Sequence, residues 1–410
     1  MNLLIFALRN LGRSRRRTII QVTGIGLVTA TMLIWGGINK GVEDLLEKTA
    51  TDLDTGELQL HAPGYVQSPD LYKTMPYVDH WQKQFAKIGL NAAPRLYGFG
   101  LVGAGNQSAG VQIRGVDLNY EPTVTELNQI VREGSWFEAE SANELVIGRT
   151  LARRLHLSPG DNVVVLAQAA DGSSANGVFR IRGVLGPVND DVDARAVYLT
   201  LPSFQNFFRL QAGVHEIALK RFDKSQELKA AANKTKTVTE RLHPQIEVRT
   251  WRELKPVVAK MLDILSVSAK FIFAFIYLSL GGIIINIAFM TIYDRISEFG
   301  TMTALGMMPR QVLGLIMAEA AWLGLFTALL AWSIGIPGAL LIQHYGLDLR
   351  IFYDQISMAG ITIKPILFTR IGATEIFAPV VFMILSLNLF CFYPGLDAAR
   401  MDPIKALNSR

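Results

Sequence analysis

Four long stretches of this chain contain almost no charged residue, and they restrict its possible folds more than any other feature of the sequence. Residues 19–38, 271–293 and 376–396 contain no Asp, Glu, Lys or Arg, and residues 311–342 contain only Glu319. Each stretch is long enough to cross a hydrocarbon core of about 30 Å as a helix. Core helices of soluble proteins rarely run twenty residues without a charge. The sequence therefore predicts a polytopic α-helical membrane protein with four transmembrane helices.

The basic residues near the start of the chain predict its orientation. Among the first 17 residues are Arg9, Arg13, Arg15, Arg16 and Arg17, with no acidic residue. Positively charged flanks stay in the cytoplasm, and the sides then alternate, which places both chain ends in the cytoplasm. We expect Arg13, Arg15, Arg16 and Arg17 to bind anionic lipid headgroups. The sequence pI of about 9.2 reflects this end and does not indicate nucleic-acid binding.

These spans and sides divide the chain into nine segments. In order they are a basic amphipathic cytoplasmic helix at 1–17, a span at 18–38, an external mixed α/β domain with stalk helices at 39–270, a span at 271–293, a short cytoplasmic helix at 294–310, a span at 311–342, a short external loop at 343–375, a span at 376–396 and a cytoplasmic tail at 397–410.

The external region is long enough for a core of its own and shows both helical and strand patterns. The pattern of residues 143–168 predicts a strand at 145–147, then a helix, then a strand at 163–166. Residues 178–185 alternate with period two, so we expect them to form a hairpin with the strand at 163–166. Apolar stripes follow the first span and precede the second, and these are either a helical stalk or plain core. Together, the strand and helix patterns and these stripes predict a large mixed α/β domain on a helical stalk.

Patterns for catalysis or metal binding are weak. The six histidines are scattered without metal-ligand spacing, and neither a Walker A motif nor a G-x-S-x-G motif is present. The acidic segment at 189–195 lacks the later glutamate of a calcium loop, so we expect a solvated loop there. We expect no catalytic residue, no metal and no cofactor in this chain. The one cysteine, Cys391, lies in the fourth span, so the external domain has no disulfide.

The segment "DRISEFGTMTALGMMPRQV" between the second and third spans is the most specific motif of the chain. It is expected to form a short helix that ends at Gly306, followed by Pro309 in the first turn of the third span. Its sequence resembles the signature of the MacB, LolC/LolE and FtsX group of ABC-transporter permeases, the mechanotransmission or type VII group, with lipoprotein-releasing permeases the most similar. The positions that fill the signature are Arg295, Glu298, Phe299, Gly300, Ala304, Leu305, Gly306 and Val312. "ELVIGRTLARRLHLSPGDNVVV" and "DAARMDPIKAL" are similar to the external domain and the ending of the same group.

The resemblance implies a bacterial inner-membrane permease with a periplasmic domain. ATP and Mg would be bound by a separate ABC ATPase dimer, and a second permease copy, identical or related, would complete the membrane part. A periplasmic lipoprotein carrier or an adaptor would be a further partner. We expect the cytoplasmic helix to couple to the ATPase. The coupling residues would be Arg295, Glu298, Phe299, Gly300, Ala304, Leu305, Gly306 and Met308.

Three functions remain open under this resemblance. The chain could extract lipoprotein or another lipid-like substrate from the outer leaflet, export small molecules through an adaptor and an outer-membrane tunnel, or act as an FtsX-like scaffold that controls a cell-wall hydrolase. Large apolar side chains at the outer ends of the first two spans favour the first function. The expected substrate cleft consists of Ile34, Trp35, Ile38, Val42, Leu265, Phe271, Phe275 and Ile276. Glu319 is expected to be structural, although a role within the span stays open.

Overall fold

The computed structural model describes residues 3–76, 80–138, 141–210, 212–223, 227–243, 245–350, 356–358, 361–363 and 366–400. These residues form two compact units. The first unit comprises the described parts of 1–44, 263–352 and 365–410, and the second comprises those of 45–262 and 353–364. Each unit has its own hydrophobic core.

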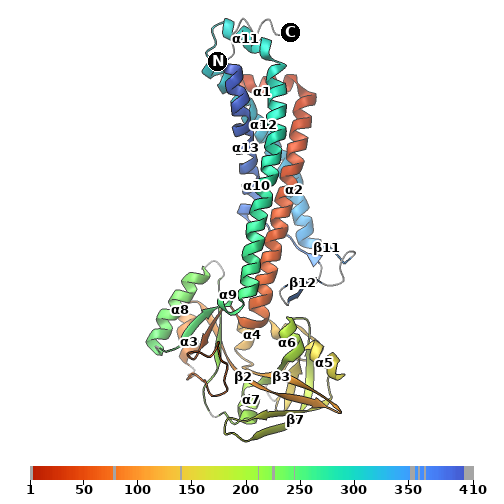
Figure 1. The fold of residues 1–410 in the computed structure, drawn as a ribbon, viewed down its shortest axis with the longest axis vertical. Coiled ribbons are helices and arrows are strands. Elements are labelled where there is room, and N and C mark those ends of the chain that lie inside the picture. The colour runs from red at the N-terminus through yellow and green to blue at the C-terminus, as the bar shows by residue number, and fades with distance from the viewer. Residues whose placement is uncertain are drawn as a thin grey trace. The chain divides into compact units, whose positions relative to one another are not determined.

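The first unit is built from four long helices that lie side by side (Figure 1). They are α2 (Arg15–Ala50), α10 (Pro256–Tyr293), α12 (Pro309–Tyr345) and α13 (Ala373–Ala399). Each is long and apolar enough to cross a membrane. Because α10 has 38 residues and so is about 57 Å long, it extends well beyond a hydrocarbon core of about 30 Å. The predicted class, a polytopic membrane protein with four spans and a large α/β domain, is confirmed.

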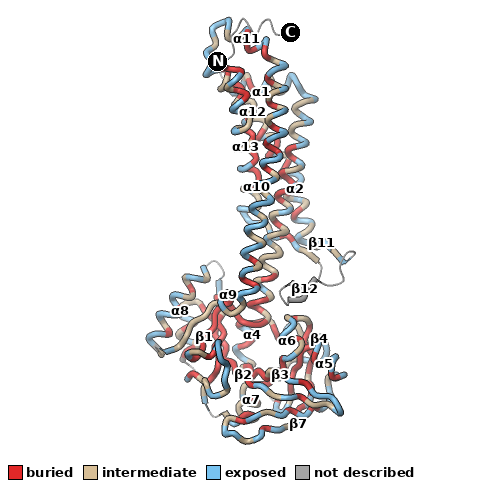
Figure 2. The backbone as a smooth tube through the Cα atoms, viewed as in Figure 1, coloured by how far each residue is buried: buried red, intermediate tan, exposed pale blue. Residues whose placement is uncertain are grey.

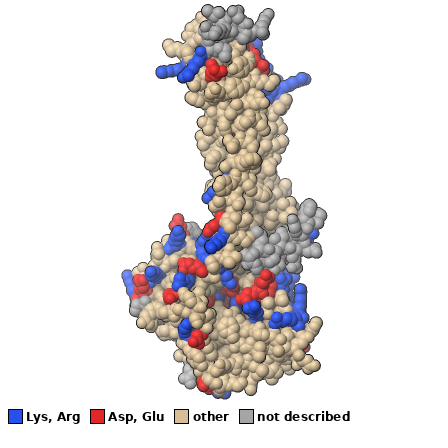
Figure 3. All heavy atoms as spheres, in the orientation of Figure 1, with Lys and Arg blue, Asp and Glu red and all other residues tan. Residues whose placement is uncertain are grey.

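The interior of this bundle is apolar, and its surface carries charge mainly at the ends. Ile25, Tyr277, Ile284 and Met383 contribute to one buried cluster that joins α2, α10 and α13. A Cβ atom on Gly281 would lie 2.3 Å from the ring of Phe390, so this glycine permits the close approach of α10 and α13. In Figure 3 the visible middle of the bundle shows neither basic nor acidic side chains, as the charge-free stretches of sequence require.

Two short helices cover one end of the bundle. α1 (Leu3–Arg13) and α11 (Ile296–Ala304) pack there against α12 around Ala7, Phe299 and Leu315. The predicted basic helix at 1–17 is corrected in one respect, because Arg15, Arg16 and Arg17 belong to α2. The chain starts a new helix at this point, where the Thr18 hydroxyl donates to the carbonyls of Leu11 and Ser14.

The second unit is organised around a ten-stranded sheet in the order β10-β1-β9-β2-β3-β8-β5-β7-β4, with β6 pairing β2 and β7. Its strands are β1 (Leu58–His61), β2 (Leu90–Ala104), β3 (Gln107–Val116), β4 (Val131–Gly134), β5 (Glu144–Ile147), β6 (Asn162–Gln168), β7 (Ser174–Leu185), β8 (Ala196–Thr200), β9 (Glu216–Arg221) and β10 (Glu247–Thr250). Most pairs are antiparallel, but β3 with β8 and β5 with β7 are parallel. In Figure 2 the residues of β1 are buried, whereas β4 is largely exposed.

Short helices pack on this sheet or connect its strands. They are η1 (Thr51–Thr55), which follows α2, and α3 (His80–Lys87), α4 (Glu121–Val124), η2 (Leu127–Gln129), α5 (Arg149–Leu155), α6 (Asp190–Arg195), α7 (Leu201–Phe208), α8 (Leu228–Leu242) and α9 (Trp251–Leu254). Between α12 and α13 the described strands are β11 (Leu347–Asp348), β12 (Ile356–Met358), β13 (Ile361–Ile363) and β14 (Ile366–Leu367). These strands lie within the segment predicted as the loop 343–375.

Two expectations for the external domain have different outcomes. The hairpin is confirmed, since β6 pairs with β7 from Asn162 opposite Arg180 to Gln168 opposite Ser174. The solvated loop at 189–195 is wrong, because this segment is the helix α6. The Asn189 side chain caps it by accepting a hydrogen bond from the Val192 N–H, and Asp193 is buried against Arg149 at 2.7 Å.

Candidate functional site

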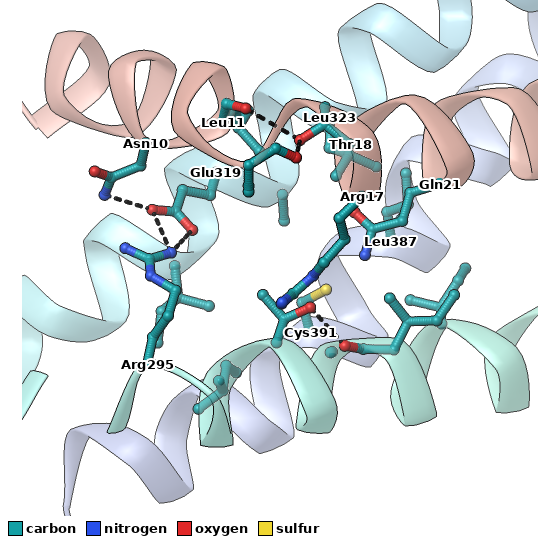
Figure 4. Close-up of a pocket in the computed structure, with 18 of the residues that line it drawn as sticks. Asn10, Leu11, Arg17, Thr18, Gln21, Arg295, Glu319, Leu323, Leu387 and Cys391 are labelled. Atoms are coloured by element: carbon teal, nitrogen blue, oxygen red, sulfur yellow. Dashed lines mark hydrogen bonds and ion pairs between the residues drawn. The ribbon is translucent and has the colours of Figure 1, made fainter. Parts of the chain in front are cut away.

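Arg295 lies at the centre of a polar network at the end of the bundle that holds α1 and α11 (Figure 4). Its Nη1 lies 2.9 Å from Glu319 Oε2, and its Nε lies 3.0 Å from Glu298 Oε2. The Asn10 side-chain amide donates to Glu319 Oε1 at 2.8 Å. Since Asn10 is on α1, Arg295 begins α11 and Glu319 is on α12, one carboxylate joins three helical segments.

This network accounts for the acidic residue of the third predicted span. The side chain of Glu319 is largely buried, and its charge is balanced by Arg295. A buried carboxylate without a partner would be strongly destabilising. The contacts give Glu319 the structural role that the sequence favoured.

α11 ends in a glycine-terminated cap that leaves its last residues exposed. The Gly306 N–H donates to the Thr303 carbonyl and the Met307 N–H to the Met302 carbonyl, the two bonds of a Schellman motif. Gly306 has φ +98°, a conformation that favours glycine. At this helix end Leu305 is 84% exposed and Ala304 is also exposed, and Met308, two residues after Gly306, is 66% exposed.

Two of the predicted coupling residues are not accessible. Phe299 is 3% exposed and packs in the core with Ala7, Ile292 and Leu315, and Gly300 is buried beside it. Arg295 lies over the Phe299 ring, 5.2 Å from its centroid. These contacts correct the expectation that Phe299 and Gly300 contact a partner directly, because they hold α11 on the bundle instead.

The basic residues near the start of the chain fall into two groups. Arg17 Nη1 lies 3.1 Å from Asp294 Oδ2, and the Arg17 side chain lines a cavity of about 100 Å³ together with Gln21 and Glu319 (Figure 4). Arg13, Arg15 and Arg16 are exposed, and Arg15 Nε donates to the Gly12 carbonyl at 3.3 Å. Three of the four arginines predicted to bind lipid headgroups are thus exposed, whereas Arg17 is ion-paired with Asp294.

The predicted substrate-cleft residues divide into an exposed group and a half-buried group. Phe271 is 72% exposed and Phe275 is 71% exposed, and with the exposed Leu278 they form a stripe along α10; Trp35 is exposed on α2. The remaining five are half-buried, namely Ile34, Ile38, Val42, Leu265 and Ile276. Ile276 packs against the bundle core, and Ile34 faces Gly338.

A buried ionic cluster in the second unit has no motif that marks it in the sequence. Asp54, in η1, lies 2.9 Å from Lys255 Nζ and 2.8 Å from Arg114 Nη1, and accepts a bond from the Asn189 side chain at 3.1 Å. The Asp54 carboxylate raises the pKa of Lys255. Asp54 and Lys255 are about 200 positions apart, and the sequence pattern gives no sign of their contact.

Two buried histidines flank Tyr65 in the same unit. The rings of His61 and Tyr65, and those of Tyr65 and His215, are stacked with centroids 5.4 Å apart. The Tyr97 N–H donates to His215 Nδ1 at 2.9 Å, so the proton of the neutral ring lies on Nε2 and is donated to the Leu71 carbonyl. Burial lowers the pKa of both histidines. Among the residues that the structure describes, no group of three or more His, Cys, Asp or Glu side chains could hold a metal ion.

Two domain families match this chain. The MacB-like periplasmic core domain matches residues 19–238, more than half of the chain. The FtsX-like permease C-terminal region matches residues 270–401. The second match contains α11 and its flanking spans, and the first contains most of the ten-stranded sheet.

One similar curated protein is the lipoprotein-releasing system transmembrane protein LolE of Haemophilus influenzae, which is 28% identical over 106 residues. That segment spans 24% of this chain and a quarter of the relative. Among solved structures, the periplasmic region of MacB from Actinobacillus actinomycetemcomitans has a TM-score of 0.37 at 12% identity over 51% of this chain and 94% of that one. The extracellular domain of the Gram-positive transporter YknZ has a TM-score of 0.35 at 14% identity over 48% of this chain and 100% of that one.

Proposed function

Because this chain belongs to the ABC-transporter permeases that combine a MacB-like periplasmic core with an FtsX-like membrane region, we propose that it couples ATP hydrolysis by a separate ATPase to movement of its external domain. The cargo in this proposal is a lipoprotein or another lipid-like molecule of the outer leaflet. The ATPase acts as a dimer, a second permease copy completes the membrane part, and a periplasmic carrier receives the cargo. ATP and Mg are bound by the partner.

The observation that carries the coupling step is the exposed tip of α11. Leu305, the C-cap of α11, and Met308, the N-cap of α12, are exposed next to the helix that Arg295 and Glu319 hold to the bundle. An exposed apolar pair on a fixed helix end suits insertion into a groove of another protein, where a few central side chains supply most of the binding energy. Glu298, exposed at the other end of α11, is available to orient the contact by charge.

Two observations favour an apolar cargo. The four apolar stretches 19–38, 271–293, 311–342 and 376–396 carry one acidic side chain, Glu319, which is already paired, so these stretches of a single chain offer no charged path for a polar solute. Phe271 and Phe275 instead present aromatic surface at the outer half of α10. Each acyl CH₂ group that is buried away from water contributes about 0.8 kcal/mol to the free energy of binding. Such a surface therefore suits acyl chains. The relative LolE carries lipoprotein release in its name, in agreement with this cargo.

The coupling step is tested with Leu305→Asp in the full chain, reconstituted with the ATPase found to copurify with it. The variant places an unpaired carboxylate in the proposed apolar contact and is expected to weaken ATPase binding by about 2 to 4 kcal/mol, with loss of permease-stimulated ATP hydrolysis. Leu305→Met keeps the apolar volume and should retain both. Unchanged binding and hydrolysis in Leu305→Asp would refute the contact.

The cargo is tested by photo-crosslinking from a probe at position 275, with position 276 as the matched control. Phe275 is exposed and Ile276 packs inward, so a cargo that contacts the stripe is trapped from 275 and not from 276. A trapped lipoprotein that is released on ATP turnover supports extraction. Crosslinks from 275 only to bulk phospholipid, unchanged by ATP, contradict it, and copurification with an adaptor and a tunnel protein would favour export instead.

A further inference from the structure

A second cavity of the first unit lies between α2, α10 and α13, and its charged lining residues include Lys40 of α2, Lys270 of α10 and Glu375 of α13. It has a volume of about 740 Å³, within the range of small-molecule sites. None of the residues of the predicted substrate cleft lines it. On α10 the lining residues Lys270, Phe273 and Tyr277 recur at helical spacing on one face, roughly 100° around the helix from the exposed Phe271.

The inner wall of this cavity is apolar although it contains a phenol. The Tyr277 hydroxyl donates its hydrogen to the Pro379 carbonyl at 2.8 Å, so its polar end is already satisfied. The Tyr277 ring then stacks with Phe382, with centroids 5.9 Å apart, and Phe273 adds a further aromatic surface. Such a wall suits hydrocarbon and offers a polar ligand no free hydrogen-bond partner at these three residues.

The other end of the cavity carries two lysines, of which only Lys40 forms an ion pair among the described residues. Lys40 Nζ lies 3.5 Å from Glu43 Oε2 and 3.4 Å from Asp44 Oδ1. The Glu375 carboxylate accepts a hydrogen bond from the Gly372 N–H. Lys270, the last charged residue before 23 charge-free positions of α10, has no carboxylate within ion-pair distance in the described part of the chain. The charged lining side chains Lys40, Lys270, Glu43 and Glu375 sum to zero, but Lys40 is ion-paired with Glu43 and Glu375 accepts a backbone N–H, so Lys270 is the lining cation left to contact an anionic group.

We propose that this cavity binds one glycerophospholipid of the outer leaflet, with its phosphate at Lys270 and one acyl chain along Phe273, Tyr277 and Phe382. Free phosphate would contact only Lys270, and an uncharged lipid would contact only the apolar wall. A phospholipid can contact both. The site is separate from the cargo stripe, because its residues lie on another face of α10. The proposal requires only that these helices span a membrane, and it does not depend on the nature of the cargo.

The test measures lipid retention by the full chain in detergent with native mass spectrometry, using dioleoyl phosphatidylglycerol as the probe. Wild type is expected to retain one molecule per chain. Lys270→Gln removes the cation and is expected to bind about fivefold to tenfold more weakly, which corresponds to about 1 kcal/mol for a lysine near a headgroup. Ala378→Trp fills the cavity and is expected to abolish retention. Lys260→Gln, an exposed lysine on the same helix outside the cavity, should behave as wild type.

Further probes separate the proposed lipid from other ligands. Dioleoyl glycerol, which has the chains without the phosphate, is expected to bind wild type and Lys270→Gln equally weakly, and millimolar inorganic phosphate should not displace the lipid. Phe275→Ala should leave retention unchanged. Equal retention by wild type, Lys270→Gln and Ala378→Trp would overturn the site, and so would loss of the lipid in Phe275→Ala or its displacement by free phosphate.

Discussion

Lys255 Nζ lies 2.9 Å from Asp54 Oδ2, so the residue that precedes α10 is ion-paired with the helical turn that follows α2. The same carboxylate binds Arg114 of β3 and the side chain of Asn189, the cap of α6. One buried acid of the second unit therefore joins η1 to Lys255, to β3 and to the cap of α6.

We expect Asp54→Ala to destabilise the second unit strongly. Arg114, whose side chain is about one-tenth exposed, would be left as an unpaired buried charge, a loss of about 3 to 5 kcal/mol in the free energy of unfolding. Denaturant unfolding of the full chain in detergent, followed by tryptophan fluorescence, measures the change. Asp171→Ala removes the exposed ion pair with Arg209 and should leave the unfolding midpoint almost unchanged, because exposed ion pairs contribute little to stability. Similar losses in the two variants would contradict the role assigned to Asp54.

The Arg295–Glu319 pair gives a second prediction. Glu319→Ala leaves Arg295 with Glu298 alone, so we expect α11 to loosen, with faster amide hydrogen exchange in 296–304 and reduced permease-stimulated ATP hydrolysis. Asn10→Ala removes only one hydrogen bond to the same carboxylate. It should lower the free energy of unfolding by about 1 to 3 kcal/mol, less than Glu319→Ala. The charge-swapped double variant Arg295→Glu with Glu319→Arg should recover part of the amide protection in 296–304. If its amides exchange as fast as those of Glu319→Ala, the ion pair does not hold α11 on the bundle.

The parts of the fold that sequence predicts well depend on local pattern. Residues 271–293 lack charge, as a helix that crosses a hydrocarbon core requires, and the structure places them within α10. Alternation in 178–185 and a glycine-containing turn predict the β6–β7 hairpin. Gly306 and Pro309 mark the end of α11 and the start of α12 because each residue type suits its backbone position. All of these signals act within a few residues of the feature that they mark.

What sequence missed depends on contacts between distant residues. Phe299 fits a signature and has the apolar character of a docking residue, but only the packing of α1 and α12 around α11 shows that it is buried. The segment 189–195 reads as solvated because it is acidic, and it becomes helix α6 with Asp193 buried because Arg149 supplies the counter-charge. Local composition cannot predict such pairs, because the partner is many positions away.

The exposed arginines at the start of the chain give a third prediction. Arg13, Arg15 and Arg16 are each expected to contribute about 1 kcal/mol beside anionic lipid, so replacing all three with Glu should disturb the topology of α2. Cysteine-accessibility mapping of the chain in cells measures the outcome. Replacing the exposed external residues Arg153, Arg154 and Arg180 with Glu makes the same change in net charge and should leave the topology intact. A normal topology in both variants would contradict the lipid contact.

The buried histidines predict that acid weakens the second unit. Because burial lowers the pKa of His61 and His215 in the folded chain, the unfolded chain takes up protons below its ordinary pKa of about 6.5 while the folded chain does not. Stability is therefore fully present above that value and falls as the pH drops toward the lowered pKa, by up to about 1.4 kcal/mol per pH unit for each histidine. Protonation of His215 Nδ1 would also remove the acceptor of the Tyr97 N–H.

The measurement is denaturant unfolding of the full chain in detergent at pH 7.0 and pH 5.5, comparing wild type with His215→Gln. Glutamine does not titrate, so the variant is expected to lose less stability between the two pH values than wild type, although it starts from a lower value at pH 7.0. His156→Asn replaces an exposed histidine with φ +53°, a conformation that asparagine tolerates, and should keep the wild-type pH dependence. If His215→Gln and His156→Asn show the same change with pH, the buried histidines are not its source.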